Sequence, residues 1–425
     1  MARVVILGAG IMGLAAALRA AQLGHHVDVL EVDSRAGGMA AHLDFAGVSI
    51  ERFYHFVCRS DAMTFAIMDE LGISDRMRWV PTSLAYYIDG RLHDWSTPLS
   101  LLKFPHLDLI SKFRYGLQMF LATRRRNWSD LDALPVRTWI ERGSGRRVYE
   151  TLWRRLLELK FFEFSEDVSA AWIWTRLKRV GTSRRSLFQE ELGYIEGGSE
   201  TLVTALCTAV EQLGGRIHLS RPVQLVEAKN GRVIAVHAGD RIFPADAVIS
   251  TVPAPLLPEL VPDLPDDTKA AYRAIRNIGV VCVMLHLRQR VSPYFWVNIV
   301  DPTIEIPGFI EFTNLRPVGA NIVYVPYYMP VTHEKWQWSN ERFVQEAFGY
   351  LRQVNSTLRE TDLLDSSIGR LRYAQPVCGP RFLETLPKVQ TPIAGLQAAD
   401  TCYYYPEDRG ISESVRFGRL MAEAL

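Results

Sequence analysis

The sequence lacks the features of several common protein classes. Its 425 residues include only five cysteines, with no C-x-x-C pair and no metal-ligand spacing. It therefore predicts no metal site and favours a reduced, cytoplasmic protein. No run of about 18 uncharged apolar residues occurs, so we expect no membrane-spanning helix. The formal net charge is only +1, which argues against a nucleic-acid partner.

This near-neutral total hides an uneven distribution of charge. Residues 112–185 contain 17 Lys and Arg but only 8 Asp and Glu, a net charge of +9, so the rest of the chain carries −8. Such a basic stretch indicates an anionic partner.

The first forty residues contain the clearest pattern. An apolar, β-branched run at residues 4–7 predicts a buried strand, and an alanine-rich segment at 11–23 predicts a helix. A second strand is expected over 27–30. The turn between the first strand and the helix has the spacing Gly-x-Gly-x-x-Gly. This order of elements is typical of a dinucleotide-binding unit.

The residues of this turn have distinct mechanical roles. Gly8 permits the tight turn, Gly10 lets a pyrophosphate approach the backbone, and Gly13 lets the helix pack closely on the strand. The helix begins at Ile11 and Met12. Its first N–H groups have no partners within the helix and favour the negative charge of a phosphate.

The next residues indicate which dinucleotide is bound. Glu31 ends the second strand, where a carboxylate can accept the hydroxyls of an adenosine ribose. With Arg35, Gly37 and Gly38 it resembles the extended motif of flavoproteins in the amine oxidase, protoporphyrinogen oxidase and phytoene desaturase superfamily. The resemblance implies that these residues hold FAD. Met39 stands where the superfamily motif usually has an arginine.

The resemblance also covers the middle and the end of the chain. Residues 194–253 resemble the second FAD-binding block of the superfamily, which implies that the backbone of Val223 meets the adenine. Residues 395–400 resemble its closing motif. The resemblance implies that Asp400 bonds to the ribityl chain, although Ala399 replaces the usual glycine.

Two further candidate cofactor-binding residues lie at the start of the last helix expected in the sequence. Gly410 and Ile411 open this helix, whose N-terminal N–H groups can favour negative charge on the reduced flavin.

The resemblance implies an α/β fold, α+β overall. We expect a Rossmann-type FAD-binding domain, glutathione reductase-like and of the amine oxidase type, formed by residues 1–85, 194–264 and 389–425. We expect a substrate domain with a helical cap at 86–193 and a mixed sheet with helices at 265–388. FAD is expected to be non-covalent, and the oligomeric state is not predicted.

Tyr54 and His55 are candidate catalytic residues. In the superfamily, the segment after the Gly-Gly pair returns towards the flavin ring, and histidine is a frequent acid–base residue. The alternative is that this aromatic run belongs to the core and that His55 makes one structural hydrogen bond.

Helical periodicity is strong from residue 107 to residue 126 and gives one apolar stripe. Two interpretations are open for this stripe. It could anchor the protein peripherally on an anionic membrane, or it could be the inner face of a cap whose outer face is solvated. We favour the second. The stripe consists of Ile110, Phe113, Leu117, Phe120 and Leu121.

The chemistry implied by the resemblance is dehydrogenation or desaturation, with hydride transfer to flavin N5. The aromatic, basic cap favours a hydrophobic small molecule, with or without an anionic group such as a phosphate or carboxylate. Lys160 and Arg409 are candidates to contact it, although solvated surface charges are the more usual finding. No second glycine fingerprint is present, so we expect no separate nicotinamide domain.

Three alternatives remain at this point. A flavin amine oxidase is disfavoured because the strand expected at 279–283 lacks the lysine that many of these enzymes have there. A non-redox flavoenzyme of the UDP-galactopyranose mutase kind would share the nucleotide-binding half. A flavin-free prenyl-binding protein, as in the Rab GDP-dissociation inhibitors, would have a related fold.

Overall fold

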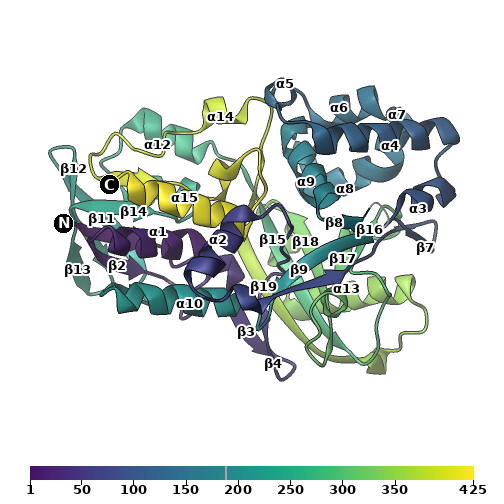
Figure 1. Cartoon of the computed structure of the whole chain (residues 1–425), viewed down its shortest axis with the longest axis horizontal. Helices are drawn as coiled ribbons and strands as arrows, with labels where there is room; N and C mark the ends of the chain where they lie inside the picture. The colour runs from purple at the N-terminus through teal and green to yellow at the C-terminus, as the bar shows by residue number, and fades with distance from the viewer. Residues whose placement is uncertain (187–188) are drawn as a thin grey trace.

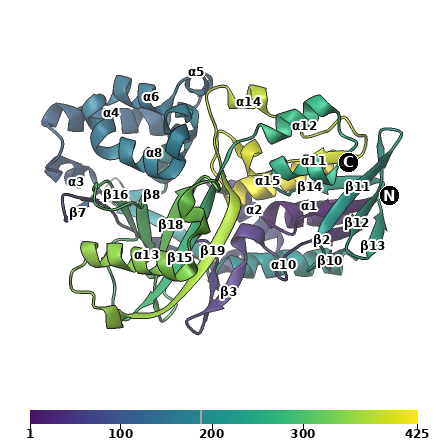
Figure 2. The same ribbon diagram turned by 180° about the vertical axis from the view of Figure 1, so that it is seen from behind.

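The computed structural model describes residues 1–186 and 189–425 of the chain. A nucleotide-type lobe contains both termini, and a second lobe contains a larger sheet with a helical cap beside it (Figure 1). The view from behind shows the same two-lobed arrangement, with the cap far from both termini (Figure 2). The predicted α/β fold class is confirmed.

A five-stranded parallel sheet forms the centre of the first lobe. Its strands come from the beginning, the middle and the end of the sequence, so the three distant segments fold as one unit. In spatial order they are β10 (Arg216–His218), β2 (His26–Leu30), β1 (Arg3–Leu7), β14 (Ala247–Ser250) and β20 (Leu396–Ala398).

Three helices pack around this sheet: α1 (Ile11–Gln22), α10 (Ser199–Gln212) and α15 (Ile411–Glu423). Helix α1 is alanine-rich and almost wholly buried. A Cβ atom at Gly418 of α15 would lie 2.3 Å from the carbonyl oxygen of Met12. Glycine at this position therefore lets α15 approach the backbone of α1 and brings both helix N-termini to the same region.

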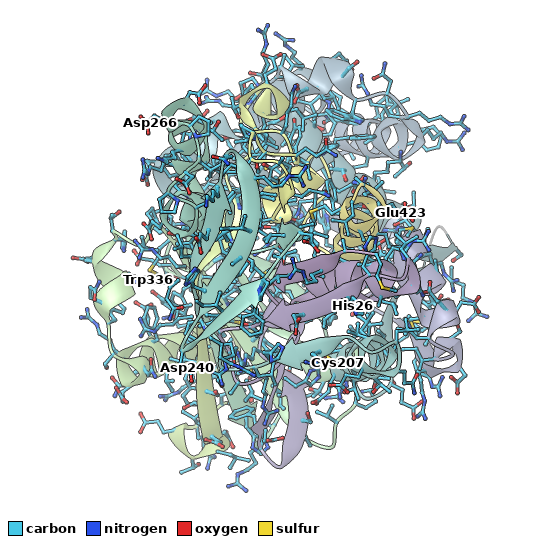
Figure 3. The ribbon with its side chains drawn as sticks, turned by 90° about the vertical axis from the view of Figure 1, so that its left-hand side faces the viewer. His26, Cys207, Asp240, Asp266, Trp336 and Glu423 are labelled. Carbon is cyan, nitrogen blue, oxygen red and sulfur yellow. The ribbon has the colours of Figure 1, made fainter. Side chains whose placement is uncertain are left out.

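A three-stranded antiparallel sheet covers the end of this lobe. It consists of β11 (Val223–Lys229), β12 (Arg232–Ala238) and β13 (Arg241–Pro244). Figure 3 looks onto this end of the molecule, with Asp240 at the turn before β13 and Glu423 at the end of α15.

The second lobe is built on a seven-stranded mixed sheet. Helix α13 (Asn340–Val354) packs against it, with the ring of Phe343 5.1 Å from that of Tyr327. In spatial order the strands are β19 (Leu363–Pro376), β15 (Asn277–Leu287), β18 (Asn321–Met329), β17 (Gly308–Glu311), β16 (Trp296–Ile299), β6 (Leu84–Ile88) and β7 (Arg91–Asp94).

Smaller elements complete the two lobes. The remaining strands are β3 (His42–Phe45), β4 (Val48–Glu51), β5 (Met77–Pro81), β8 (Arg184–Ser186) and β9 (Gln189–Ile195). The cap helices are α3 (Pro98–Lys103), α4 (Leu109–Arg124), α5 (Ser129–Asp132), α6 (Val136–Gly143), α7 (Arg146–Val148), α8 (Arg154–Phe161) and α9 (Ala170–Thr182). The others are α2 (Ala62–Glu70), α11 (Leu257–Leu260), α12 (Asp266–Arg273) and α14 (Phe382–Thr385).

Helix α4 corrects a sequence-based interpretation. The apolar stripe is not the inner face of the cap: Ile110 is 73% exposed and Phe113 is 71% exposed. The inner face instead carries Lys112, Tyr115 and Gln118, all buried. Lys112 and Gln118 are tolerated there because they bond to backbone carbonyls. Lys112 Nζ donates to Leu102 at 2.7 Å, and Gln118 Nε2 donates to a residue of α6 at 3.1 Å.

No helix in the described part of the chain combines the length and apolarity needed to cross a bilayer.

Candidate functional site

A cavity of about 1510 Å³ lies between the two lobes. Its wall runs from the glycine-rich turn after β1, past the N-terminus of α15, to the inner side of the cap helices α3, α4, α8 and α9. Sites for one small ligand usually occupy about 300–1,000 Å³. This cavity is therefore large enough for a dinucleotide and a substrate together.

The glycine-rich turn forms one end of the cavity. Gly8 has φ +98°, which a residue with a side chain rarely adopts, and a Cβ atom at Gly10 would meet nothing within 4 Å. The open space beside Gly10 is the cradle that a pyrophosphate needs. Gly13 does not line the cavity. A Cβ atom there would lie 1.9 Å from the carbonyl oxygen of Gly8, so Gly13 allows the close packing of α1 on β1.

Ile11 and Met12 line the cavity at the N-terminus of α1. The side chain of Glu31 reaches the same region from the end of β2. Its Oε2 accepts a hydrogen bond from the Ala9 backbone N–H at 2.7 Å, and its Oε1 accepts one from Asp33 at 2.9 Å. These bonds fix the carboxylate beside the glycine turn, and a carboxylate can accept further bonds from a ligand.

Gly37, Gly38 and Met39 also line the cavity. Gly37 (φ +114°) and Gly38 (φ +58°) lie against the backbone of Gly10. Arg35 does not reach the cavity, because its guanidinium pairs with Asp44 at 2.9 Å on an exposed surface.

A basic side chain that sequence reasoning did not assign reaches the cavity instead. Arg52 lines the cavity and pairs with Asp33. Sequence reasoning missed Arg52 because the stretch that contains it was interpreted only for its aromatic residues and His55.

The remaining predicted cofactor residues lie along the same wall. Val223 lines the cavity at the start of β11. Asp400 accepts hydrogen bonds from the backbone N–H groups of Ala254 at 2.7 Å and Cys402 at 2.8 Å, and burial raises its pKa. Gly410 and Ile411 line the cavity at the N-terminus of α15.

Tyr54 and His55 both line the cavity, so the structure brings these candidates to the site. Burial lowers the pKa of His55, which keeps its ring neutral at pH 7. Its Nδ1 lies 2.7 Å from the carbonyl oxygen of Phe53, an acceptor only, so Nδ1 carries the proton and Nε2 keeps a lone pair. Burial and the neighbouring Tyr328 raise the pKa of Tyr54.

Lys160 and Arg409 meet at the same part of the cavity, although they lie 249 positions apart in the sequence. The ammonium of Lys160 lies 4.9 Å from the ring of Trp172 and 5.0 Å from that of Tyr328. Burial and then the nearby Arg176 lower the pKa of Lys160 well below its usual value. Neither predicted charge is therefore a freely solvated surface group.

Sequence reasoning missed the residues that complete this cluster. Asp408 pairs with Arg176. Burial alone would raise the pKa of Asp408, but Arg176, Lys160 and Arg409 lower it to about 2. Because Asp408 pairs with Arg176, the guanidinium of Arg409 keeps its positive charge at the cavity, beside the Lys160 amine whose pKa is lowered. Asp408 lies two residues before Gly410, a predicted cofactor residue, and this short spacing could have marked Asp408 as a residue near the site.

Glu190 is a second missed residue on the cavity wall. Its side chain is buried; Thr82 Oγ1 donates a hydrogen bond to it at 3.3 Å, and Arg184 Nη2 forms an ion pair with it at 3.8 Å. Burial raises the pKa of Glu190 to about 7 despite the opposing charge of Arg184. Nothing in its local sequence marks it as a cavity residue.

The residues present suit FAD. The turn beside Gly10 leaves space for a pyrophosphate, and Glu31 is fixed where a ribose would lie. Two helix N-termini, those of α1 and α15, open onto the cavity, and their N–H groups favour negative charge. This donor set matches a dinucleotide better than it matches an apolar ligand alone.

Comparison with known proteins agrees with this site. The family described as flavin containing amine oxidoreductase matches residues 11–396. The chain is 23% identical over 308 residues to the 15-cis-phytoene desaturase of Glycine max, covering 67% of this chain and 53% of that protein. It is 23% identical over 344 residues to the flavin-containing amine oxidase A of Canis lupus familiaris, covering 75% and 63%.

Among solved structures, a reduced UDP-galactopyranose mutase is similar in fold, with a TM-score of 0.76 at 15% identity over 100% of this chain and 93% of that one. The chain spans about half the length of the phytoene desaturases that it matches. The predicted superfamily is confirmed, and the chain belongs to the family of flavin-containing amine oxidoreductases.

Proposed function

We propose that this protein is an FAD-dependent oxidoreductase that dehydrogenates a hydrophobic, anionic small molecule. The observation that carries the proposal is a single cavity with a dinucleotide cradle at one end and an aromatic, cationic pocket at the other. FAD, held non-covalently, would supply the atom that accepts a hydride, N5 of its ring.

The chain's own residues account for cofactor binding in this proposal. Glu31 would accept the ribose hydroxyls, and the N–H groups around Gly10 would contact the pyrophosphate. Asp400, already held by two backbone N–H groups, would bond to the ribityl chain. The N-terminus of α15 at Gly410 would favour negative charge on the flavin.

The cationic cluster supports an anionic substrate. Lys160 and Arg409 face a pocket whose walls are largely aromatic, so a carboxylate or phosphate would be placed at one point while the apolar body fills the rest. The lowered pKa of Lys160 means that the pocket holds its positive charge poorly when empty. An entering anion would restore that charge and gain affinity from it.

His55 supports a role in moving a proton. Dehydrogenation of a C–C bond removes a hydride from one carbon and a proton from its neighbour. The neutral ring of His55, with its proton fixed on Nδ1 by the Phe53 carbonyl, leaves Nε2 able to accept that proton. Tyr54 stays protonated because its pKa is raised, and it would orient the substrate.

Amine oxidation is the weaker alternative. Strand β15 brings Val280 and Cys282 to the cavity wall. Its segment 279–283 has no lysine, whereas many flavin amine oxidases have one in this strand.

An anaerobic titration tests the proposal. The FAD-loaded protein is mixed with a long-chain unsaturated fatty acid, an isoprenoid diphosphate, a tetrapyrrole carboxylate, a neutral carotenoid and a primary alkylamine in turn. We expect the flavin absorbance to bleach with one of the anionic lipophiles. Bleaching by the amine alone would instead indicate an amine oxidase. Bleaching by NAD(P)H alone would indicate a reductase or a non-redox flavoenzyme.

A substitution at Lys160 tests whether the pocket prefers an anionic substrate. Lys160→Met should raise KM for the anionic substrate by about tenfold, because a charged hydrogen bond is lost, while leaving the bound flavin spectrum unchanged. An unchanged KM would remove Lys160 from the substrate site.

A further inference from the structure

The outer side of helices α3 and α4 carries a concentration of exposed apolar side chains, which we call the cap surface. Of the 19 exposed large hydrophobic residues in the described part of the chain, eight lie on these two helices. Their exposed fractions range from 45% at Leu117 to 74% at Leu109. The cap surface consists of Leu99, Leu102, Leu109, Ile110, Phe113, Leu117, Phe120 and Leu121.

The arrangement of the cap surface is that of an interfacial helix. On α4 the apolar residues recur every three or four positions and so form one stripe along the helix. Helix α3 packs beside it, with Leu101 Cδ2 3.8 Å from where a Cβ atom of Gly116 would lie. Both helices lie at the outer end of the cap in Figures 1 and 2, away from the nucleotide lobe.

The charged residues around the cap surface indicate which kind of partner it binds. Lys103, Arg114, Arg124 and Arg126 are exposed and make no ion pair with a carboxylate in the described residues. No acidic residue occurs between Asp108 and Asp130. An apolar stripe edged with unpaired cations is complementary to an anionic lipid surface.

A second copy of the chain is a poorer partner for the same surface. A two-fold dimer contact places the same patch on both subunits. Because this patch is edged with cations and lacks acidic residues, such a contact would bring like charges together.

The cap surface also adjoins the cavity. Leu101, Met119 and Thr123, on the inner sides of the same two helices, line the cavity. Phe120 belongs to both surfaces, since it is 50% exposed and also lines the cavity. The cap surface and the cavity wall therefore meet at Phe120.

We propose that the cap surface docks this protein peripherally on anionic membranes and that its lipophilic substrate enters the cavity between α3 and α4. The docking stands on the exposed residues and charges alone. The entry route rests on the proposed function.

Vesicle co-sedimentation of the FAD-loaded full chain tests the docking. The probes are vesicles of phosphatidylcholine alone and vesicles that also contain phosphatidylglycerol, at low and high salt. We expect binding to the anionic vesicles at low salt, and weaker binding at high salt.

Paired variants locate the contact. Ile110→Ser with Phe113→Ser should lower the partition coefficient at least about tenfold, because two apolar side chains no longer enter the lipid. The matched control, Ile242→Ser with Leu420→Ser, removes two exposed apolar side chains (62% and 49% exposed) from the other lobe and should leave binding unchanged.

A second pair tests the charges. Arg124→Gln with Arg126→Gln should weaken binding to anionic vesicles several-fold, whereas Lys229→Gln with Lys388→Gln, an equal loss of charge at exposed positions elsewhere, should not.

Three outcomes would overturn the proposal: no binding to anionic vesicles, equal losses in test and control variants, or a dimer in solution that Phe113→Ser converts to monomer. Failure of docking is separable from failure of the proposed function. Bleaching of flavin by a detergent-solubilised substrate should be the same in wild type and in the Ile110→Ser, Phe113→Ser variant.

Discussion

Helices α1 and α4 both carry periodic apolar residues, but these residues are buried in α1 and exposed in α4. Both sequences predict a helix, and both form one close to the expected range. In α1 the apolar residues are buried against the sheet, whereas in α4 they face outwards and Lys112 and Gln118 face inwards. Periodicity therefore predicts that a helix has an apolar face, but it does not say whether protein or another medium covers that face.

The largest expected effect lies in the nucleotide lobe. Gly13→Ala should lower the free energy of unfolding by about 3 kcal/mol, because its Cβ atom would lie 1.9 Å from the Gly8 carbonyl oxygen. Urea unfolding followed by circular dichroism measures this. The control is Gly349→Ala in α13, where a Cβ atom meets nothing within 4 Å. That substitution should stabilise by about 0.5–1 kcal/mol, and a similar loss in both variants would contradict the packing role of Gly13.

The next effect concerns FAD itself. Glu31→Gln should weaken FAD binding about 10- to 100-fold, because hydrogen bonds to a charged acceptor contribute about 1.5–3 kcal/mol. Fluorescence titration of the flavin gives the affinity. Asp28→Asn is the control: Asp28 lies on β2, three residues before Glu31, but bonds to His218 at 2.7 Å and does not line the cavity. Equal affinity in wild type and Glu31→Gln would show that Glu31 does not hold the cofactor.

A pair of substitutions in α4 sharpens the contrast with α1. Lys112→Met should cost about 1–2 kcal/mol of unfolding free energy, since the Leu102 carbonyl loses its buried donor. Ile110→Lys should change stability by less than about 0.5 kcal/mol because the side chain is exposed. The reverse ranking would mean that the apolar stripe is packed in solution after all.

The smallest effect is a dependence on pH at Glu190. The pKa of this residue is about 7 in the folded protein and 4.5 in an ordinary glutamate, so the folded state binds more protons between these values. Its contribution to stability is present below about pH 4.5 and is lost as pH rises towards 7. The stability difference between wild type and Glu190→Gln should therefore fall as pH rises across that window, and a flat difference would contradict the raised pKa.

Much of the nucleotide lobe could be predicted because its signals are local. The glycine turn and Glu31 each depend on a few consecutive residues, and the turn forms with Gly8 in the positive-φ region (φ +98°). Strand β19 was not predicted. It is the edge strand of the larger sheet, so it lacks the alternation of buried and exposed residues that marks a strand in sequence.

Residues of the candidate site could be predicted only where they belong to a local sequence motif. Tyr54, His55 and the cofactor residues, apart from Gly13 and Arg35, line the cavity as placed by their motifs. The pair of Arg176 and Asp408 joins positions 232 residues apart, and no local pattern reports such a contact.

The central claim, that the cavity is a non-covalent FAD site, is tested most directly by the visible spectrum of the purified protein. The protein is incubated with FAD, passed through gel filtration and then precipitated with acid. We predict one FAD per chain before precipitation, with all of it released into the supernatant. A colourless protein that retains no FAD would contradict the account and favour a flavin-free binding protein, whereas flavin that stays with the precipitate would contradict non-covalent attachment.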